Sequence, residues 1–187
     1  MNTVFIADDE LIIRQGIKCI IDWEQLGFEI IGEASNGEDA LNFILSKKPD
    51  LVLMDIRMPK MLGLEVVENA RKRGFNGKVI ILSGYTDFKY AQAAIKNGVD
   101  YYLTKPIDED ELYETVSAIS SQINKEAKEE ETLSNYRDKA KGMILFDILT
   151  GVPTINNIAD MNIHADIYQV VIYEKYSHQA TGIYSTS

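Results

Sequence analysis

Short apolar runs alternate with amphipathic segments along the first two thirds of the chain. Five runs rich in β-branched and aromatic residues are predicted strands: Thr3 to Ala7, Glu29 to Ala34, Leu51 to Met54, Lys78 to Leu82 and Tyr101 to Thr104. Between them, apolar residues recur every three or four positions, which predicts helices over Leu11 to Ile21, Glu38 to Lys47, Leu64 to Arg73 and Phe88 to Lys96. Alternating strands and helices form a parallel sheet that is covered on both faces. We therefore predict an α/β fold.

Turn-forming residues support these boundaries. Asn36-Gly37 precedes the second helix, and Lys48-Pro49-Asp50 precedes the third strand. Asn76-Gly77 and Asn97-Gly98 stand before the fourth and fifth strands. The connections are short, as a compact α/β unit with right-handed crossovers requires.

The chain changes character after the fifth strand. A helix is predicted to open at Asp108, where acidic residues suit the electropositive helix N-terminus, and Ile123 ends its apolar stripe. We predict a first domain over residues 1–124, an exposed helical connector over 125–141, and a short α+β tail over 142–187. The tail is too short for its own core, so its strand, Tyr168 to Tyr173, is expected to pair within a dimer or with the connector.

Composition narrows the function. The 19 basic residues against 29 acidic ones give a net charge of -10, which repels a nucleic-acid backbone overall. The single cysteine excludes an internal disulfide, and no apolar run reaches the roughly 18 residues of a membrane span. The N-terminus enters a strand directly without a secretory signal, so we expect a cytoplasmic protein without membrane contact.

Charged and hydroxyl residues stand at the ends of four predicted strands. Asp8 and Asp9 follow the first strand, Asp55 the third, Ser83 the fourth and Lys105 the fifth. Carboxyl ends of parallel strands meet at one edge of a sheet, where ligands bind. Clustered carboxylates repel one another, and Mg²⁺ is the natural counter-ion for such a site. Asp55 could then attack a phosphoryl group, with Lys105 and Ser83 around the transferred oxygens.

These motifs, in this order, resemble the receiver domain of two-component response regulators over residues 2–124. Asp8-Asp9-Glu10 is similar to the acidic motif of that family, in which Asp9 is the direct metal ligand and Asp8 acts partly through water. Asp55 matches the phosphoacceptor, and the backbone carbonyl of Arg57 matches a further metal ligand.

The resemblance extends to the last two strands. Ser83-Gly84 matches the hydroxyl residue and its small neighbour, and Lys105-Pro106 matches the lysine and the peptide that the family holds in cis. Tyr102 takes the place of the switch aromatic. The resemblance implies a flavodoxin-like sheet of five parallel strands in the order 2-1-3-4-5. It also implies that Mg²⁺ is the cofactor and that a sensor histidine kinase supplies the phosphoryl group to Asp55. Such a protein is a phosphoacceptor switch and not an enzyme with a separate substrate.

A narrower likeness involves Ile21 to Ala34 and Ser83 to Ala91. These stretches are similar to receivers fused to an arabinose-regulator (AraC) type DNA-binding domain. The likeness implies a fragment of a transcription regulator that forms a homodimer on activation and contacts DNA only through a C-terminal domain absent from this chain. The alternative is a stand-alone adaptor that signals by protein–protein contacts.

Other functions fit the residues less well. A dinucleotide-binding enzyme needs a glycine fingerprint after the first strand, where Asp8 to Leu11 stand. A phosphatase of the haloacid dehalogenase type needs an acid two residues beyond its nucleophile, where Arg57 stands. Individually, an aspartate at a strand end is more often a turn former or a helix cap.

Overall fold

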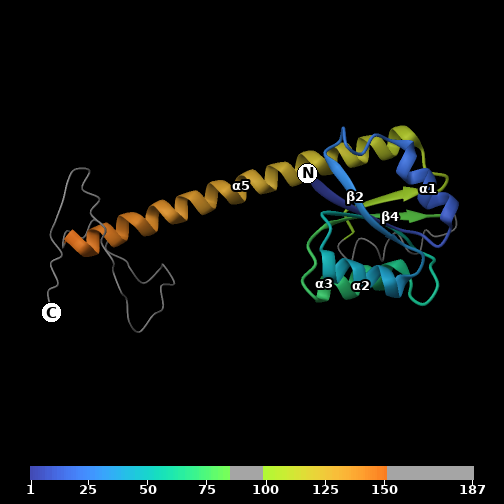
Figure 1. Cartoon of the computed structure of the whole chain (residues 1–187), viewed down its shortest axis with the longest axis horizontal. Helices are drawn as coiled ribbons and strands as arrows, with labels where there is room; N and C mark the ends of the chain where they lie inside the picture. Colours follow the sequence, from blue (N-terminus) through green and yellow to red (C-terminus); the bar gives the residue numbers. More distant parts are fainter. Residues whose placement is uncertain (85–98, 151–187) are drawn as a thin grey trace, which may run out of the picture. The chain divides into compact units, whose positions relative to one another are not determined.

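The computed structural model describes residues 1–84 and 99–150, without the side chains of residues 144 and 147–150 (Figure 1). The chain divides into two compact units, Met1–Ser134 and Asn135–Ser187. The predicted helix Phe88 to Lys96 and the predicted strand Tyr168 to Tyr173 lie outside the described residues.

A five-stranded parallel sheet forms the centre of the first unit. Its strands are β1 (Asn2–Ala7), β2 (Phe28–Ala34), β3 (Leu51–Asp55), β4 (Lys78–Ser83) and β5 (Tyr101–Thr104), in the order β2-β1-β3-β4-β5. The described helices are α1 (Leu11–Ile20), α2 (Gly37–Lys47), α3 (Gly63–Lys72) and α5 (Glu109–Thr150). The predicted fold class and strand order are confirmed, and the bounds of the predicted strands and first three helices lie within one residue of those observed.

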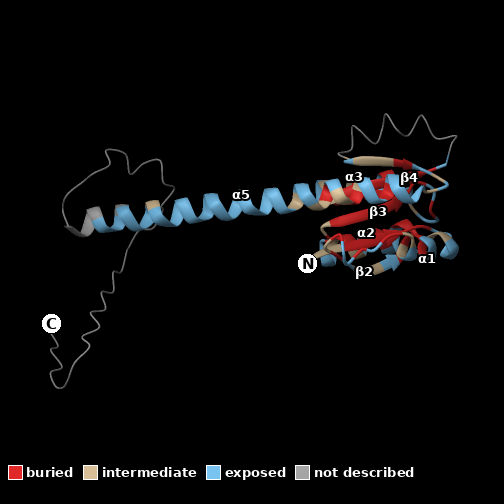
Figure 2. Cartoon of the chain, turned by 90° about the horizontal axis from the view of Figure 1, so that it is seen from above, coloured by how far each residue is buried: buried red, intermediate tan, exposed pale blue. Residues whose placement is uncertain are grey.

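Helices cover both faces of the sheet, α1 and the start of α5 on one face and α2 and α3 on the other (Figure 1). Successive residues of a strand point to opposite faces. In β1, Val4 and Ile6 therefore pack towards α1 and α5, whereas Phe5 and Ala7 pack towards α2 and α3. The central strand β3 is buried along its whole length (Figure 2). This explains why its sequence is a continuous apolar run that ends in Asp55.

Trp23 packs between the first helix and the second strand. Its side chain is buried, its Nε1 donates a hydrogen bond to the carbonyl of Ile17 at 3.0 Å, and its ring meets Phe28 edge-on at 6.4 Å. Trp23 is the chain's single tryptophan, so its fluorescence reports on the packing of this unit.

Gly63 holds the loop after β3 against the start of α3. Its N–H donates to the carbonyl of Ile56 at 2.9 Å. A Cβ atom at this position would lie only 2.0 Å from the carbonyl oxygen of Asp55. A glycine is therefore required here by the close approach of the two backbones.

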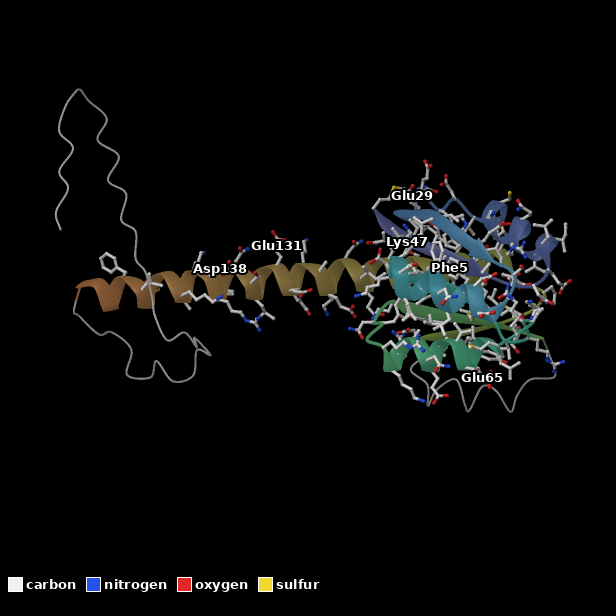
Figure 3. The ribbon with its side chains drawn as sticks, turned by 60° about the horizontal axis from the view of Figure 1, so that its bottom comes forward. Phe5, Glu29, Lys47, Glu65, Glu131 and Asp138 are labelled. Atoms are coloured by element: carbon white, nitrogen blue, oxygen red, sulfur yellow. The ribbon has the colours of Figure 1, made fainter. Side chains whose placement is uncertain are left out.

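The helical segments predicted after β5 form one helix, α5, of 42 residues. Leu112, Val116 and Ile119 are completely buried against the sheet. Residues 124–139 are exposed, and Figure 3 shows the side chains of Glu131 and Asp138 extending outward from the helix. Lys78 at the start of β4 pairs with Glu126 at 2.8 Å and ties this region to the sheet. Among the described residues, no helix is both long and apolar enough to cross a membrane.

Candidate phosphoacceptor site

Three strand ends bring one ammonium group and two carboxylates together. Lys105, directly after β5, has its Nζ 2.7 Å from Asp8 Oδ2 and 2.5 Å from Asp55 Oδ1. Asp8 follows β1 and is completely buried, and Asp55 ends β3 with 5% of its surface exposed. The parallel register places these ends side by side, because Ala7 pairs with Met54 and Asp55 with Leu82. The structure thus brings together three residues that lie far apart in the sequence.

Backbone hydrogen bonds hold each acid in place. Asp8 Oδ1 accepts from the N–H of Glu10 at 3.0 Å, and Asp55 Oδ2 accepts from the N–H of Arg57 at 2.6 Å. The N–H of Lys105 donates to the carbonyl of Ser83 at 2.7 Å. Asp8 and Asp55 therefore stabilise their own turns and also present a carboxylate oxygen to the shared ammonium. The same two aspartates thus act as turn formers and lie together with Lys105 at the carboxyl edge of the sheet.

The electrostatics follow from two carboxylates sharing one cation. Burial raises the pKa of Asp55, and the charge of Asp8 raises it further, while Lys105 and the N–H of Arg57 act in the opposite direction without cancelling the rise. Burial alone would lower the pKa of Lys105, but its bonds with Asp55 and Asp8 outweigh this effect and raise it. Lys105 is thus a permanent cation at neutral pH, and the acids carry more negative charge than it can balance.

The site can accept a hard cation. Carboxylate oxygens of Asp8, Asp9 and Glu10 lie within 4.8 Å of one another, with Asp9 and Glu10 exposed. Asp8 Oδ2 is buried and has the close ammonium of Lys105 beside it, but no hydrogen bond of good geometry. Oxygen donors and excess negative charge are what Mg²⁺ requires. Glu10 is not among the metal ligands predicted from the sequence, but its carboxylate lies with those of Asp8 and Asp9, and its position directly after Asp9 is the sequence signal for this.

An open pocket of about 270 Å³ lies over these groups. It is lined by Asp9, Glu10, Asp55, Ile56, Arg57, Gly84 and Lys105. The pocket gives solvent and small molecules access to the largely buried Asp55. A phosphoryl group on Asp55 would have the ammonium of Lys105 and the N–H of Arg57 beside it, which are groups that stabilise developing negative charge.

The two predicted switch residues belong to neighbouring strands, Ser83 to β4 and Tyr102 to β5. Ser83 is buried at the end of β4, where its Oγ donates to the carbonyl of Gly84 at 3.1 Å. Tyr102 is half-buried and packs against the core under α2 and α3. Neither Ser83 nor Tyr102 is among the described residues that line the pocket. The Lys105–Pro106 peptide is cis.

The family model of the response regulator receiver domain matches residues 4–117. The chain belongs to this family. The chain is 34% identical over 163 residues to the uncharacterized transcriptional regulatory protein YesN of Bacillus subtilis, a match that covers 83% of this chain and 44% of that protein. It is 44% identical over 112 residues to the transcriptional regulatory protein HptR of Staphylococcus aureus, covering 60% of this chain and 44% of that one. The matches thus span less than half the length of these relatives.

Solved receiver structures agree with this assignment. The receiver domain of AraT, a response regulator from Geobacillus stearothermophilus, superimposes with a TM-score of 0.65 at 41% identity, covering 67% of this chain and 98% of that one. A two-component transcriptional regulator AraC from Clostridium phytofermentans gives a TM-score of 0.61 at 35% identity, covering 67% and 97%. The chain is therefore similar to receivers of AraC-family response regulators, as its sequence motifs indicate.

Proposed function

We propose that Asp55 accepts a phosphoryl group from a phosphohistidine of a sensor histidine kinase. The bond from phosphorus to the imidazole nitrogen breaks as a bond from phosphorus to an Asp55 oxygen forms. The observation that carries this proposal is the position of Asp55. Its carboxylate lies under an open pocket, with Lys105 Nζ at 2.5 Å from one oxygen and the N–H of Arg57 at 2.6 Å from the other. Phosphoryl transfer depends mainly on such positioning and charge stabilisation.

Mg²⁺ is the cofactor we propose for this step. Asp8, Asp9 and Asp55 would hold it together with the backbone carbonyl of Arg57, and Glu10 lies close enough to add a carboxylate through water. When bound, Mg²⁺ supplies the positive charge that lets a phosphoryl group approach a cluster of carboxylates. Lys105 would supply a second positive charge, since its Nζ lies 2.7 Å from Asp8 and 2.5 Å from Asp55.

The output we propose is control of transcription through an AraC-type DNA-binding domain outside this chain. The similarity to YesN and HptR, both named as transcriptional regulatory proteins, supports this, as does the likeness to the AraT and AraC receivers. Phosphorylation would draw the hydroxyl of Ser83 towards the phosphoryl group and turn Tyr102 inward, which favours a homodimer. A coding sequence that continues past Ser187 into a helix-turn-helix would support transcriptional output, whereas a natural stop would support the stand-alone adaptor.

Intact-mass measurement tests the phosphoacceptor. We expect the protein to gain one phosphoryl group when incubated with Mg²⁺ and acetyl phosphate. Asp55→Ala should gain none. Asp50→Asn, at the opposite end of β3, provides the matched control and should be phosphorylated like the wild type. Phosphorylation of Asp55→Ala, or equal phosphorylation without Mg²⁺, would contradict the proposal.

A further inference from the structure

A buried arginine lies directly behind the acidic turn. Arg14 belongs to α1, yet only 8% of it is exposed. Its Nη1 donates a hydrogen bond to the carbonyl oxygen of Asp8 at 2.7 Å. Its Nε lies 3.5 Å from Glu33 Oε2 on β2. A buried guanidinium is costly unless it is paired, so its place here requires an explanation beyond packing.

Glu33 on the neighbouring strand is the charge partner of this arginine, although Arg14 Nε makes no hydrogen bond of good geometry with it. The same Oε2 atom lies 2.5 Å from Nζ of Lys18, one helical turn after Arg14. The bond with Lys18 is the main reason why the pKa of Glu33 is lowered, so Glu33 is an anion at neutral pH. Arg14 is thus held between a fixed carboxylate on one side and the backbone of Asp8 on the other.

The bond to Asp8 acts on two acids at once. The carbonyl of Asp8 and the N–H of Asp9 belong to one planar peptide, so a bond that fixes this oxygen also fixes the direction in which the chain enters Asp9. The N–H of Asp8 is held independently by the carbonyl of Ala34 at 3.1 Å. With both of its peptides fixed, Asp8 keeps its carboxylate against Lys105 at 2.7 Å.

We propose that Arg14 is a positioning residue for the Mg²⁺ site, which sets the orientation of Asp8 and Asp9 by holding the peptide between them. This inference rests on the proposed function, because it assigns a purpose to the acid pair at that site. Arg14 itself acts through the backbone, and it is not among the described residues that line the pocket. Residues that orient metal ligands in this way typically change metal affinity about 10- to 100-fold when they are replaced.

The test compares two arginines with the same kinds of bonds at different places. Arg71 on α3 also donates from Nη1 to a backbone carbonyl, that of Phe75 at 2.9 Å, and pairs with Asp100 at 3.3 Å. Phe75 and Asp100 precede β4 and β5, at the end of the sheet opposite the pocket. Arg71→Met is therefore a matched control for the general loss of a structural arginine.

Mg²⁺ titrations followed by backbone amide resonances give the dissociation constant of each variant. We expect Arg14→Met to weaken Mg²⁺ binding roughly 10-fold or more and Arg71→Met to leave it within about twofold of the wild type. Wild-type affinity in Arg14→Met, or an equal loss in Arg71→Met, would overturn the inference. If Arg14→Met does not fold, Arg14→Lys decides, because one ammonium cannot replace the guanidinium fork that reaches both Asp8 and Glu33. Unchanged affinity in that variant would also overturn it.

The result separates this inference from the proposed function. Suppose that the wild-type protein binds Mg²⁺ and is phosphorylated on Asp55. If the Arg14→Met variant then binds Mg²⁺ equally well, only the role of Arg14 is refuted. A wild-type protein that binds no Mg²⁺ refutes both.

Discussion

Replacing Asp55 by asparagine should stabilise the metal-free protein, although it removes a close ion pair. Two buried carboxylates share the single ammonium of Lys105, which lies 2.7 Å from Asp8 and 2.5 Å from Asp55. In Asp55→Asn, Lys105 keeps Asp8 as its partner, and the amide oxygen can still accept the hydrogen bond from the N–H of Arg57. The variant therefore removes one desolvated charge and leaves a neutral pair.

The sign of this effect follows from the raised pKa of Asp55. Burial, reinforced by the charge of Asp8, makes ionised Asp55 less favourable in the folded protein than in the unfolded chain. Desolvation of one carboxylate costs several kcal/mol, of which attraction to Lys105 offsets most. Replacing buried paired charges by neutral groups is often stabilising, so we expect a net gain on the order of 1 kcal/mol for Asp55→Asn. For a domain of this size, that gain corresponds to a rise in Tm of roughly 3 to 6 °C.

The pH dependence provides an internal check. Above the raised pKa of folded Asp55 the wild type carries the full cost of ionisation, so the advantage of Asp55→Asn is complete there. As the pH falls through this raised pKa, folded Asp55 takes up a proton and the advantage shrinks. It should vanish below the ordinary pKa of an aspartate, where Asp55 is neutral in both the folded and the unfolded chain.

Thermal unfolding followed by Trp23 fluorescence in EDTA measures this effect. Asp50→Asn is the control, because Asp50 accepts two hydrogen bonds from Thr3 and its replacement should lower Tm. Saturating Mg²⁺ should reverse the order, since metal at ten times its Kd adds about 1.4 kcal/mol to a protein that binds it. A lower Tm for Asp55→Asn than for wild type in EDTA at neutral pH would refute the charge-excess reasoning.

Three further predictions concern the packing of the fold around the sheet. Gly63→Ala should lower both the Tm and the rate of phosphorylation by acetyl phosphate. The reason is that the backbone of Asp55 must move away from the new methyl group. An unchanged rate would show that this contact is unimportant. Leu112→Ala should cost about 2 to 5 kcal/mol in denaturant unfolding, whereas Leu133→Ala, which is exposed on the same helix, should cost close to nothing. Lys78→Met should lower the free energy of unfolding by about 1 kcal/mol or less, because its partner Glu126 is largely exposed. The same variant should speed amide hydrogen exchange in α5 around Glu126. Unchanged exchange would show that the ion pair does not anchor the helix.

The strands and helices can be predicted from the sequence because their signals are local. The apolar run from Leu51 to Met54 and the helical spacing from Leu11 to Ile21 depend on residues a few positions apart. The lysine and the acids of the site were found because they stand at strand ends, and a parallel sheet gathers such ends at one edge. The sequence alone therefore determined the α/β fold and placed Asp8, Asp55 and Lys105 on one edge of the sheet.

Tertiary structure decided how these groups bond with one another. The register of the strands and the packing of α1 against β2 join residues that are distant in the sequence, and no local pattern encodes such distances. Only the folded chain shows that Lys105 forms ion pairs with both Asp8 and Asp55, and that Ser83 is buried at the end of β4 while Tyr102 packs against the core under α2 and α3. The bond from Arg14 to the peptide of Asp8 was invisible in the sequence for the same reason, because a helical arginine is usually a solvated charge until packing encloses it.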